Sequence, residues 1–138
     1  MRALFFCLKV KDAMIADKLK RGTNMTDWPE SYYAVIFTNQ RSDEGSDLYQ
    51  IMSDKMVTLA AEQPGFLGVE SVRGDDGLGI TVSYWESRDA ISAWGRHGEH
   101  MIAQKMGRQE FYLWFQLRIA KIEETRSFGL AQLAHQAD

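Results

Sequence analysis

The sequence has 138 residues, of which 45% are hydrophobic and 25% are charged, and its formal net charge is −3. This length and apolar content are typical of one globular domain with a single hydrophobic core. The one cysteine, Cys7, excludes an intrachain disulfide, and no run approaches the roughly 18 consecutive apolar residues that a transmembrane helix requires. We therefore expect a cytoplasmic protein with no membrane partner.

Charge is unevenly distributed along the chain. Residues 1–24 contain six Lys or Arg and two Asp or Glu, whereas residues 25–138 contain ten and seventeen. An acidic body argues against nucleic acid as the main partner. The basic lead segment could contact an anionic surface, but short charged termini are usually mobile, so we interpret residues 1–30 as a loosely ordered extension. A chain that starts at Met25 should then melt close to the full chain.

The first predicted element is a strand over residues 32–41, YYAVIFTNQR, which is rich in aromatic and β-branched residues. Side chains alternate between the two faces of a strand. Here both faces are largely apolar, with Tyr33, Val35, Phe37 and Asn39 on one and Tyr32, Ala34, Ile36 and Thr38 on the other. This pattern indicates a strand that is covered on both sides.

Residues 42–66 change to a helical period. Apolar side chains recur at spacings of three and four residues and predict an amphipathic helix. The stripe consists of Leu48, Met52, Met56 and Leu59, widened by Ile51, Val57 and Ala60. Ser46 or Asp47 can cap the start of this helix, and Pro64-Gly65 stops it.

A hairpin and a second helix follow. Residues 66–86 contain two short strands around a Gly-Asp-Asp-Gly turn, and Ser87 caps the next helix. Gly95 and Gly98 each cost up to about 1 kcal/mol of helix propensity, so we expect a break or a second short helix before Gly107. One face of this segment carries Ala90, Trp94, His97 and Met101.

Residues 110–124, EFYLWFQLRIAKIEE, predict a last, long aromatic strand. The resulting order β-α-β-β-α-β is that of the ferredoxin-like α+β fold, with a four-stranded antiparallel sheet and both helices on one face. The helices leave the other apolar face of the sheet bare, and a second copy of the chain is the simplest cover. We therefore expect a homodimer, with residues 125–138 as a C-terminal tail.

This order and two segments, QPGFLGVESVRG and ITVSYWESRDAISAWGRHGEH, resemble the antibiotic biosynthesis monooxygenase family of the dimeric α+β barrel superfamily. The resemblance covers about residues 32–124 and favours a domain over residues 31–124. It implies a homodimeric barrel with the helices outside and a pocket in each subunit between sheet and helices. The family includes oxygenases that need no metal or flavin, haem-degrading oxygenases, and members with no assigned substrate.

The haem-degrading members use an Asn on the first strand, a Trp on the second helix and a His ten residues after that Trp. Asn39 and Trp94 match the first two, but Gln104 occupies the position of the haem ligand. His97 or His100 could replace it only if the bend at Gly98 re-aims the ring. The resemblance therefore favours a protein without a cofactor and makes haem the less favoured alternative.

Four residues are candidates for catalysis: Asn39, Trp94, His97 and His100. Asn39 could face the pocket or bond local backbone, and Trp94 could line the pocket or belong to the core. A neutral imidazole can accept a phenol proton near neutral pH, because its unperturbed pKa is about 6.5. No third ligand accompanies the two histidines, so no metal site is predicted. The candidates for substrate contact, with packing as the alternative, are Phe37, Trp85 and Met101.

The first hypothesis for function is a cofactor-independent monooxygenase that acts on a small phenol- or quinol-like substrate with molecular oxygen. The pocket would exclude water, a histidine would favour the phenolate, and Asn39 and Trp94 would orient the substrate and its developing oxyanion. A non-catalytic small-molecule binding module is the second hypothesis, because a fold does not fix a function. A haem-binding or haem-degrading oxygenase is the third.

Overall fold

The computed structural model describes residues 28–43 and 45–129. These residues form four strands and three helices in the predicted β-α-β-β-α-β order, with the second helical segment broken in two, and a five-residue π-helical turn, η2, precedes the last strand. The elements are β1 (Tyr32–Arg41), α2 (Ser46–Ala61), β2 (Phe66–Arg73), β3 (Leu78–Trp85), α3 (Arg88–Gly95), α4 (Gly98–Met106), η2 (Gly107–Phe111) and β4 (Tyr112–Ile122). The predicted first strand has the bounds of β1.

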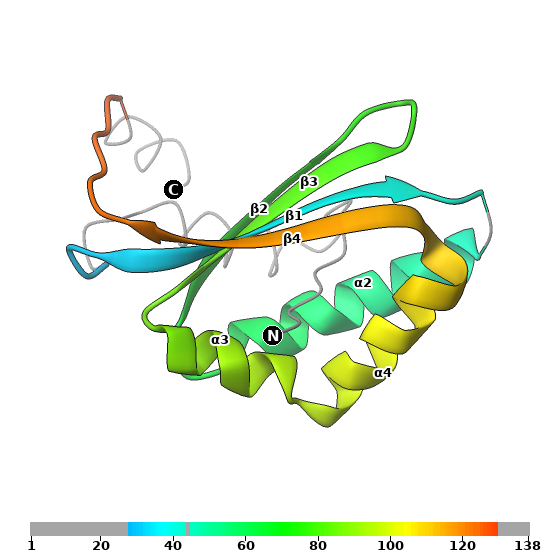
Figure 1. Cartoon of the computed structure of the whole chain (residues 1–138), viewed down its shortest axis with the longest axis horizontal. Coiled ribbons are helices and arrows are strands. Elements are labelled where there is room, and N and C mark those ends of the chain that lie inside the picture. Colours follow the sequence, from blue (N-terminus) through cyan, green and yellow to red (C-terminus); the bar gives the residue numbers. More distant parts are fainter. Residues whose placement is uncertain (1–27, 44, 130–138) are drawn as a thin grey trace, which may run out of the picture.

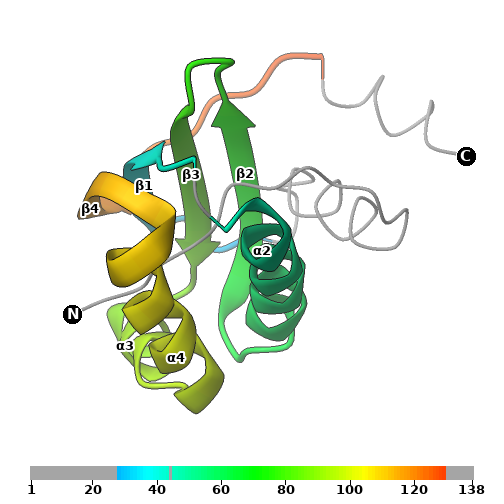
Figure 2. The same cartoon turned by 90° about the vertical axis from the view of Figure 1, so that its right-hand side faces the viewer.

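The strands form one antiparallel sheet in the order β2-β3-β1-β4. Figure 1 shows all three helices on one side of this sheet, and Figure 2 shows α2 beside the α3–α4 pair. This arrangement is the predicted ferredoxin-like α+β fold. It follows from the alternation of short apolar strands with amphipathic helices, each of which must bury one face against the sheet.

The two faces of the sheet differ in what covers them. The face under the helices contains Val35, Phe37 and Asn39 of β1, all fully buried. None of the described helices lies against the opposite face in Figure 1, and this face carries four large apolar side chains that are 40–70% exposed: Val72, Leu78, Ile80 and Trp114. We call this the uncovered sheet face. The prediction that β1 is covered on both sides holds for the face under the helices, and a cover for the other face stays a prediction.

Helix α2 differs from the sequence prediction in its cap and its buried stripe. Its N-cap is Gly45, in the left-handed conformation at φ 68°, and neither Ser46 nor Asp47 caps it. Leu48 and Ile51 are exposed, because the helix turns Tyr49 toward the sheet instead. The buried residues are Tyr49, Ser53, Met56, Val57 and Ala60. Tyr49 takes this place because two arginines and two aromatic rings contact it there.

The second helical segment has the predicted cap and the predicted break. The Ser87 hydroxyl accepts a hydrogen bond from the Ala90 amide at 3.1 Å, and the helix ends at Gly95. A new helix begins after His97, which is the N-cap of α4 with an extended backbone. Because of the break, α4 does not continue the buried face of α3. Met101 is 54% exposed, whereas Trp94 is fully buried. The prediction of one common face for these two residues is therefore wrong.

Residues near both ends of the domain pack on the same strand. The Trp28 ring lies 5.1 Å from the Tyr32 ring and 5.3 Å from the Tyr84 ring. The Tyr32 hydroxyl shares a 2.7 Å hydrogen bond with Thr125. Of the predicted lead segment, residues 1–27 and with them the truncation at Met25 lie outside the described residues, whereas Trp28 packs on the sheet. Among the helices that the structure describes, none is both long and apolar enough to cross a bilayer.

Candidate functional site

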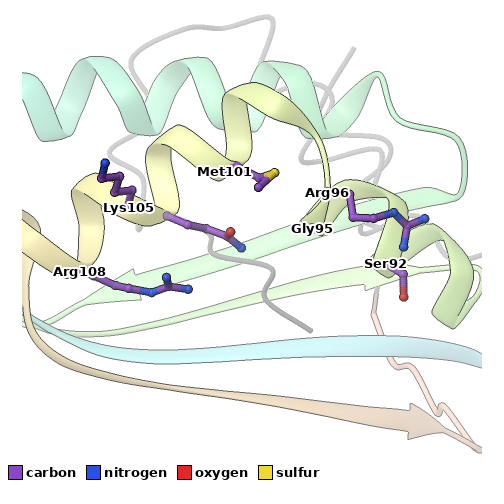
Figure 3. A pocket seen from close by; sticks show the side chains of 7 residues that line it. Ser92, Gly95, Arg96, Met101, Lys105 and Arg108 are labelled. Carbon is purple, nitrogen blue, oxygen red and sulfur yellow. The ribbon is translucent and has the colours of Figure 1, made fainter.

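A hollow of about 550 Å³ lies against α3 and α4, and we call it the α3–α4 hollow. This volume suits a drug-sized molecule, for which pockets measure roughly 300–1,000 Å³. Its described lining consists of Ser92, Gly95, Arg96, Met101, Gln104, Lys105 and Arg108. Figure 3 shows Lys105 and Arg108 at one end and Arg96 and Ser92 at the other, with Met101 between them.

The lining of the hollow combines positive charge with one buried amide. Arg96, Lys105 and Arg108 contribute three cations, and no carboxylate is among the described lining residues. None of the three forms an ion pair with another described residue. Gln104 is only 6% exposed, and its Nε2 has no hydrogen-bond partner among the described residues. A buried amide nitrogen without an acceptor is costly, unless a ligand supplies one.

The same two helices hold a tryptophan–histidine cluster of Trp94, His97 and His100. The His100 ring stacks on Trp94 with centroids 4.2 Å apart and planes at 15°, and the His97 ring lies 5.4 Å from Trp94. The break after Gly95 permits this, because the chain turns there and brings His100 back over the preceding helix.

A hydrogen bond determines how His100 is protonated when neutral. Its Nδ1 lies 3.0 Å from the Trp94 carbonyl oxygen. A carbonyl can only accept, so Nδ1 carries the proton and the basic lone pair of the neutral ring is on Nε2. His100 is fully buried, whereas His97 is half-buried, and the Nδ1 of His97 has no hydrogen-bond partner among the described residues.

Asn39 lies in a separate polar cluster at the end of β1. Its Oδ1 accepts a 2.8 Å hydrogen bond from Arg73 Nη2, which also lies 3.1 Å from the Tyr49 hydroxyl. Asn39 is fully buried, and its Nδ2 has no hydrogen-bond partner among the described residues. The amide oxygen is thus committed to Arg73, and the amide nitrogen remains available as a donor.

Arg41 and Tyr112 complete the surroundings of this polar cluster. The Arg41 guanidinium lies 3.8 Å from the centre of the Tyr49 ring and donates a hydrogen bond to the Phe111 carbonyl. Burial lowers the pKa of Arg41. Burial, followed by the neighbouring Tyr49, raises the pKa of Tyr112 well above its ordinary value. Aromatic faces and carbonyl oxygens therefore hold two cations here, and they fix the ends of β1, α2 and β4.

The three residues predicted to contact substrate occupy different places. Phe37 and Trp85 are fully buried in the core, and neither is among the described residues that line the hollow. Trp85 stacks on Trp94 with centroids 6.4 Å apart. Met101 does line the hollow. The structure thus brings Trp94, His97 and His100 together on the helices that form the hollow, and it places Asn39 in the cluster with Arg73.

The sequence of this chain matches a known family over most of the folded domain. The profile of the family described as "Antibiotic biosynthesis monooxygenase" matches residues 31–106. The uncharacterized protein YqjZ of Bacillus subtilis (strain 168) is 52% identical over 97 residues, which are 70% of this chain and 84% of that protein. The chain belongs to the antibiotic biosynthesis monooxygenase family.

Solved structures of low sequence identity share the fold. Rv0793 from Mycobacterium tuberculosis superposes with a TM-score of 0.57 at 15% identity, covering 70% of this chain and 97% of that one. SnoaB, a cofactor-independent oxygenase from Streptomyces nogalater, superposes with a TM-score of 0.54 at 12% identity. That match covers 73% of this chain and 99% of SnoaB. These likenesses confirm the ferredoxin-like fold of the family.

The lining of the hollow does not fit the haem ligation that the family resemblance associates with some members. The position of the ligand, ten residues after Trp94, is Gln104, whose amide lacks the imidazole nitrogen that binds haem iron. His100 is fully buried and stacked on Trp94, and it is not among the described residues that line the hollow. Among residues 28–43 and 45–129, no group of three or more His, Cys, Asp or Glu side chains is arranged to hold a metal ion.

Sequence reasoning missed most of the lining of the hollow. Lys105 and Arg108 lie nine and twelve residues after Arg96. The three side chains line the same hollow only because the chain bends between α3 and α4. Gln104 was considered only as a substitute at the haem-ligand position. A signal was present in the sequence, because Lys105 and Arg108 share a helical face.

Proposed function

We propose that this protein is a cofactor-independent monooxygenase that acts on a small phenol- or quinol-like substrate bound in the α3–α4 hollow. The observation that carries the proposal is that this hollow lies on the helices that also hold the tryptophan–histidine cluster. Family membership and the likeness to SnoaB, described as a cofactor-independent oxygenase, support it.

In this proposal His97 is the base that accepts the phenol proton. It is half-buried at the break between the helices, next to Arg96 of the hollow, and its Nδ1 has no partner among the described residues. His100 is a positioning residue, since its hydrogen bond to the Trp94 carbonyl fixes the stacked pair. Trp94 is fully buried and is not among the described lining residues, so its role is to orient the two histidine rings that lie against it. Asn39 donates to the developing oxyanion through its Nδ2, which requires a substrate that extends under the helices to β1.

The reaction balances without any further reductant. A phenol that carries a free ring C–H and one molecule of O₂ give a quinone and one molecule of water, so the substrate supplies all four electrons. His97 takes the phenol proton, and the phenolate transfers an electron to O₂. Recombination forms a peroxide anion on the ring carbon. Loss of the ring hydrogen and cleavage of the O–O bond then give the quinone, and the proton returned by His97 completes the water.

The test is oxygen uptake by the purified full chain with a panel of hydroquinones, naphthols and anthrones, followed by mass spectrometry after reaction under ¹⁸O₂. We expect uptake above the autoxidation rate of each compound, and one labelled oxygen atom in the quinone. Quinone without the label would mean that the protein catalyses dehydrogenation of the substrate and not its oxygenation. Binding of these compounds without uptake would favour the non-catalytic binding module.

His97→Gln tests the base directly. General-base catalysis contributes roughly 10²–10⁴-fold, so we expect kcat to fall at least a hundredfold, with partial rescue by imidazole added to the buffer. Arg88→Gln is the control, because Arg88 is an exposed residue of α3 outside the described lining. An unchanged kcat in His97→Gln would remove His97 from the mechanism and leave His100 as the only histidine of the cluster to test.

The proposal also includes a homodimer in which two uncovered sheet faces pack together. Large apolar side chains on this face are 40–70% exposed, and a soluble monomer rarely presents such a patch. Two sheets packed face to face are about 10 Å apart and interdigitate their side chains. The barrel that results would leave the helices, and with them the α3–α4 hollow, on the outside.

A further inference from the structure

We infer that the ligand of the α3–α4 hollow is an aromatic carboxylic acid, so that the substrate of the proposed monooxygenase is a phenolic acid and not a neutral phenol. This inference rests on the proposed function for the reactive part of the ligand. The charged part follows from the lining of the hollow alone.

The first step is the sign of the charge. Three of the seven described lining residues are cations, none is an anion, and the three cations form no ion pair with a described residue. The contrast with the rest of the molecule is sharp, because the chain as a whole has a formal net charge of −3. A concave surface of one sign concentrates ligands of the opposite sign.

The second step is the buried amide. Gln104 is 94% buried, lines the hollow, and has an Nε2 without a partner among the described residues. Its donor needs an acceptor, and a carboxylate oxygen can accept from this amide and from a guanidinium at the same time. Exposed cations alone would leave the charge of the ligand open, whereas a buried donor among them indicates an anion that enters the hollow.

The third step is the size and the apolar part of the ligand. About 550 Å³ gives room for a ligand much larger than an inorganic anion, which favours an organic acid. Met101 lies between the cationic ends of the hollow in Figure 3. Gly95 also lines the hollow and has no side chain that would occupy it. Guanidinium planes and methionine sulfur both pack well on flat rings. An aromatic body with one carboxylate uses all of these contacts.

The test uses 1-hydroxy-2-naphthoate and its methyl ester as matched probes, titrated into the full chain by calorimetry under nitrogen in 50 mM salt. We expect the acid to bind at least tenfold more tightly than the ester, and its advantage to shrink as salt is raised. Arg108→Gln and Arg96→Gln should each weaken binding of the acid about three- to tenfold and leave the ester unchanged. Gln104→Leu should weaken the acid as well.

Arg88→Gln is the control for charge, because it removes an exposed cation at the start of α3, outside the described lining. Equal affinities of acid and ester, or no binding of either, would overturn the inference. So would a loss in Arg88→Gln as large as that in Arg108→Gln, since this would mean long-range attraction without a site.

The same experiment separates this inference from the proposed function. If the acid binds preferentially under nitrogen but admission of air causes no oxygen uptake, the inference stands and the monooxygenase proposal fails. If neutral naphthols are oxidised while the acid shows no preference in binding, the monooxygenase stands and the inference fails.

Discussion

Asn39 connects the predicted site to the stability of the fold. Its amide oxygen is an acceptor for Arg73, a residue that finds its other acceptors in the Tyr49 hydroxyl and the Gly77 carbonyl. A hydrogen bond to a charged group contributes about 1.5–3 kcal/mol, and loss of a buried acceptor leaves the donor unsatisfied. Asn39 therefore has a structural role at β1 whatever it does for a substrate.

We predict that Asn39→Ala lowers the free energy of unfolding by about 2 kcal/mol, whereas Asn39→Asp is neutral or stabilising at pH 7. The aspartate keeps the acceptor for Arg73, adds an opposite charge, and removes the amide nitrogen that has no partner among the described residues. Urea denaturation of both variants measures the difference. Equal losses in the two variants would mean that Arg73 does not depend on this acceptor.

A second prediction at this scale concerns alkaline pH. Burial raises the pKa of Tyr112, and burial with the hydrogen bond to Glu70 raises that of Tyr84. In the unfolded chain both phenols ionise near pH 10. Above this pH the folded state therefore holds more protons than the unfolded state, and stability present below pH 10 is lost as the pH rises toward the folded pKa values.

For Tyr112 alone, the free energy of unfolding should fall by up to about 1.4 kcal/mol per pH unit above pH 10. Tyr112→Phe should reduce this slope, whereas Tyr33→Phe, a half-buried tyrosine on the same sheet, should keep it. Denaturation series at pH 8, 10 and 11 give the three slopes. The same slope in Tyr112→Phe and in the unmodified chain would show that Tyr112 ionises in the folded state.

Among the elements, the turn between α2 and β2 depends most clearly on one residue type. Gly65 has a φ of 84°, and a Cβ added there would lie 2.7 Å from the Cβ of Ala90 at the start of α3. Its carbonyl also accepts a 2.8 Å hydrogen bond from the Glu86 amide. The Pro-Gly pair therefore does more than end a helix, because it sets how closely α3 approaches the turn.

We predict that Gly65→Ala destabilises the protein by more than Gly77→Ala. Both positions have similar positive φ, which costs a non-glycine residue roughly 1–2 kcal/mol. At Gly77 the only atom closer than 3.0 Å to the added methyl is at the end of the Gln40 side chain, which can move. Melting temperatures of the two variants isolate the contribution of the contact with Ala90. Equal shifts would mean that α3 adjusts without cost.

The comparison of sequence and structure is most instructive for these elements. The strands and the Ser87 cap could be predicted, because alternation and capping are local properties of the chain. The side of α2 that is buried could not be predicted, because Tyr49 turns inward to contact Arg41 and Arg73, which come from two different strands. The lining of the hollow was missed for the same reason, since the angle between α3 and α4 decides which side chains meet.

For the molecule as a whole, the uncovered sheet face predicts the state of association. We expect the full chain to sediment as a dimer at micromolar concentration. Ile80→Lys should shift it to a monomer, because a lysine in the centre of two packed sheets would bury an unpaired charge. Ile51→Lys is the control, since Ile51 is 64% exposed on α2 and away from the sheet. A monomeric unmodified chain would contradict the barrel assembly.

The position of β1 in the sheet has a consequence for how the chain folds as it is made. This strand pairs on one side with β3 and on the other with β4, whose partner residues extend from Tyr112 to Ile122. Pairing over such a long separation in sequence is slow to form. Until the ribosome has released the last strand, β1 presents an open edge that can recruit the same strand from a neighbouring nascent chain. A stall in translation before Tyr112 would therefore favour aggregates built on β1.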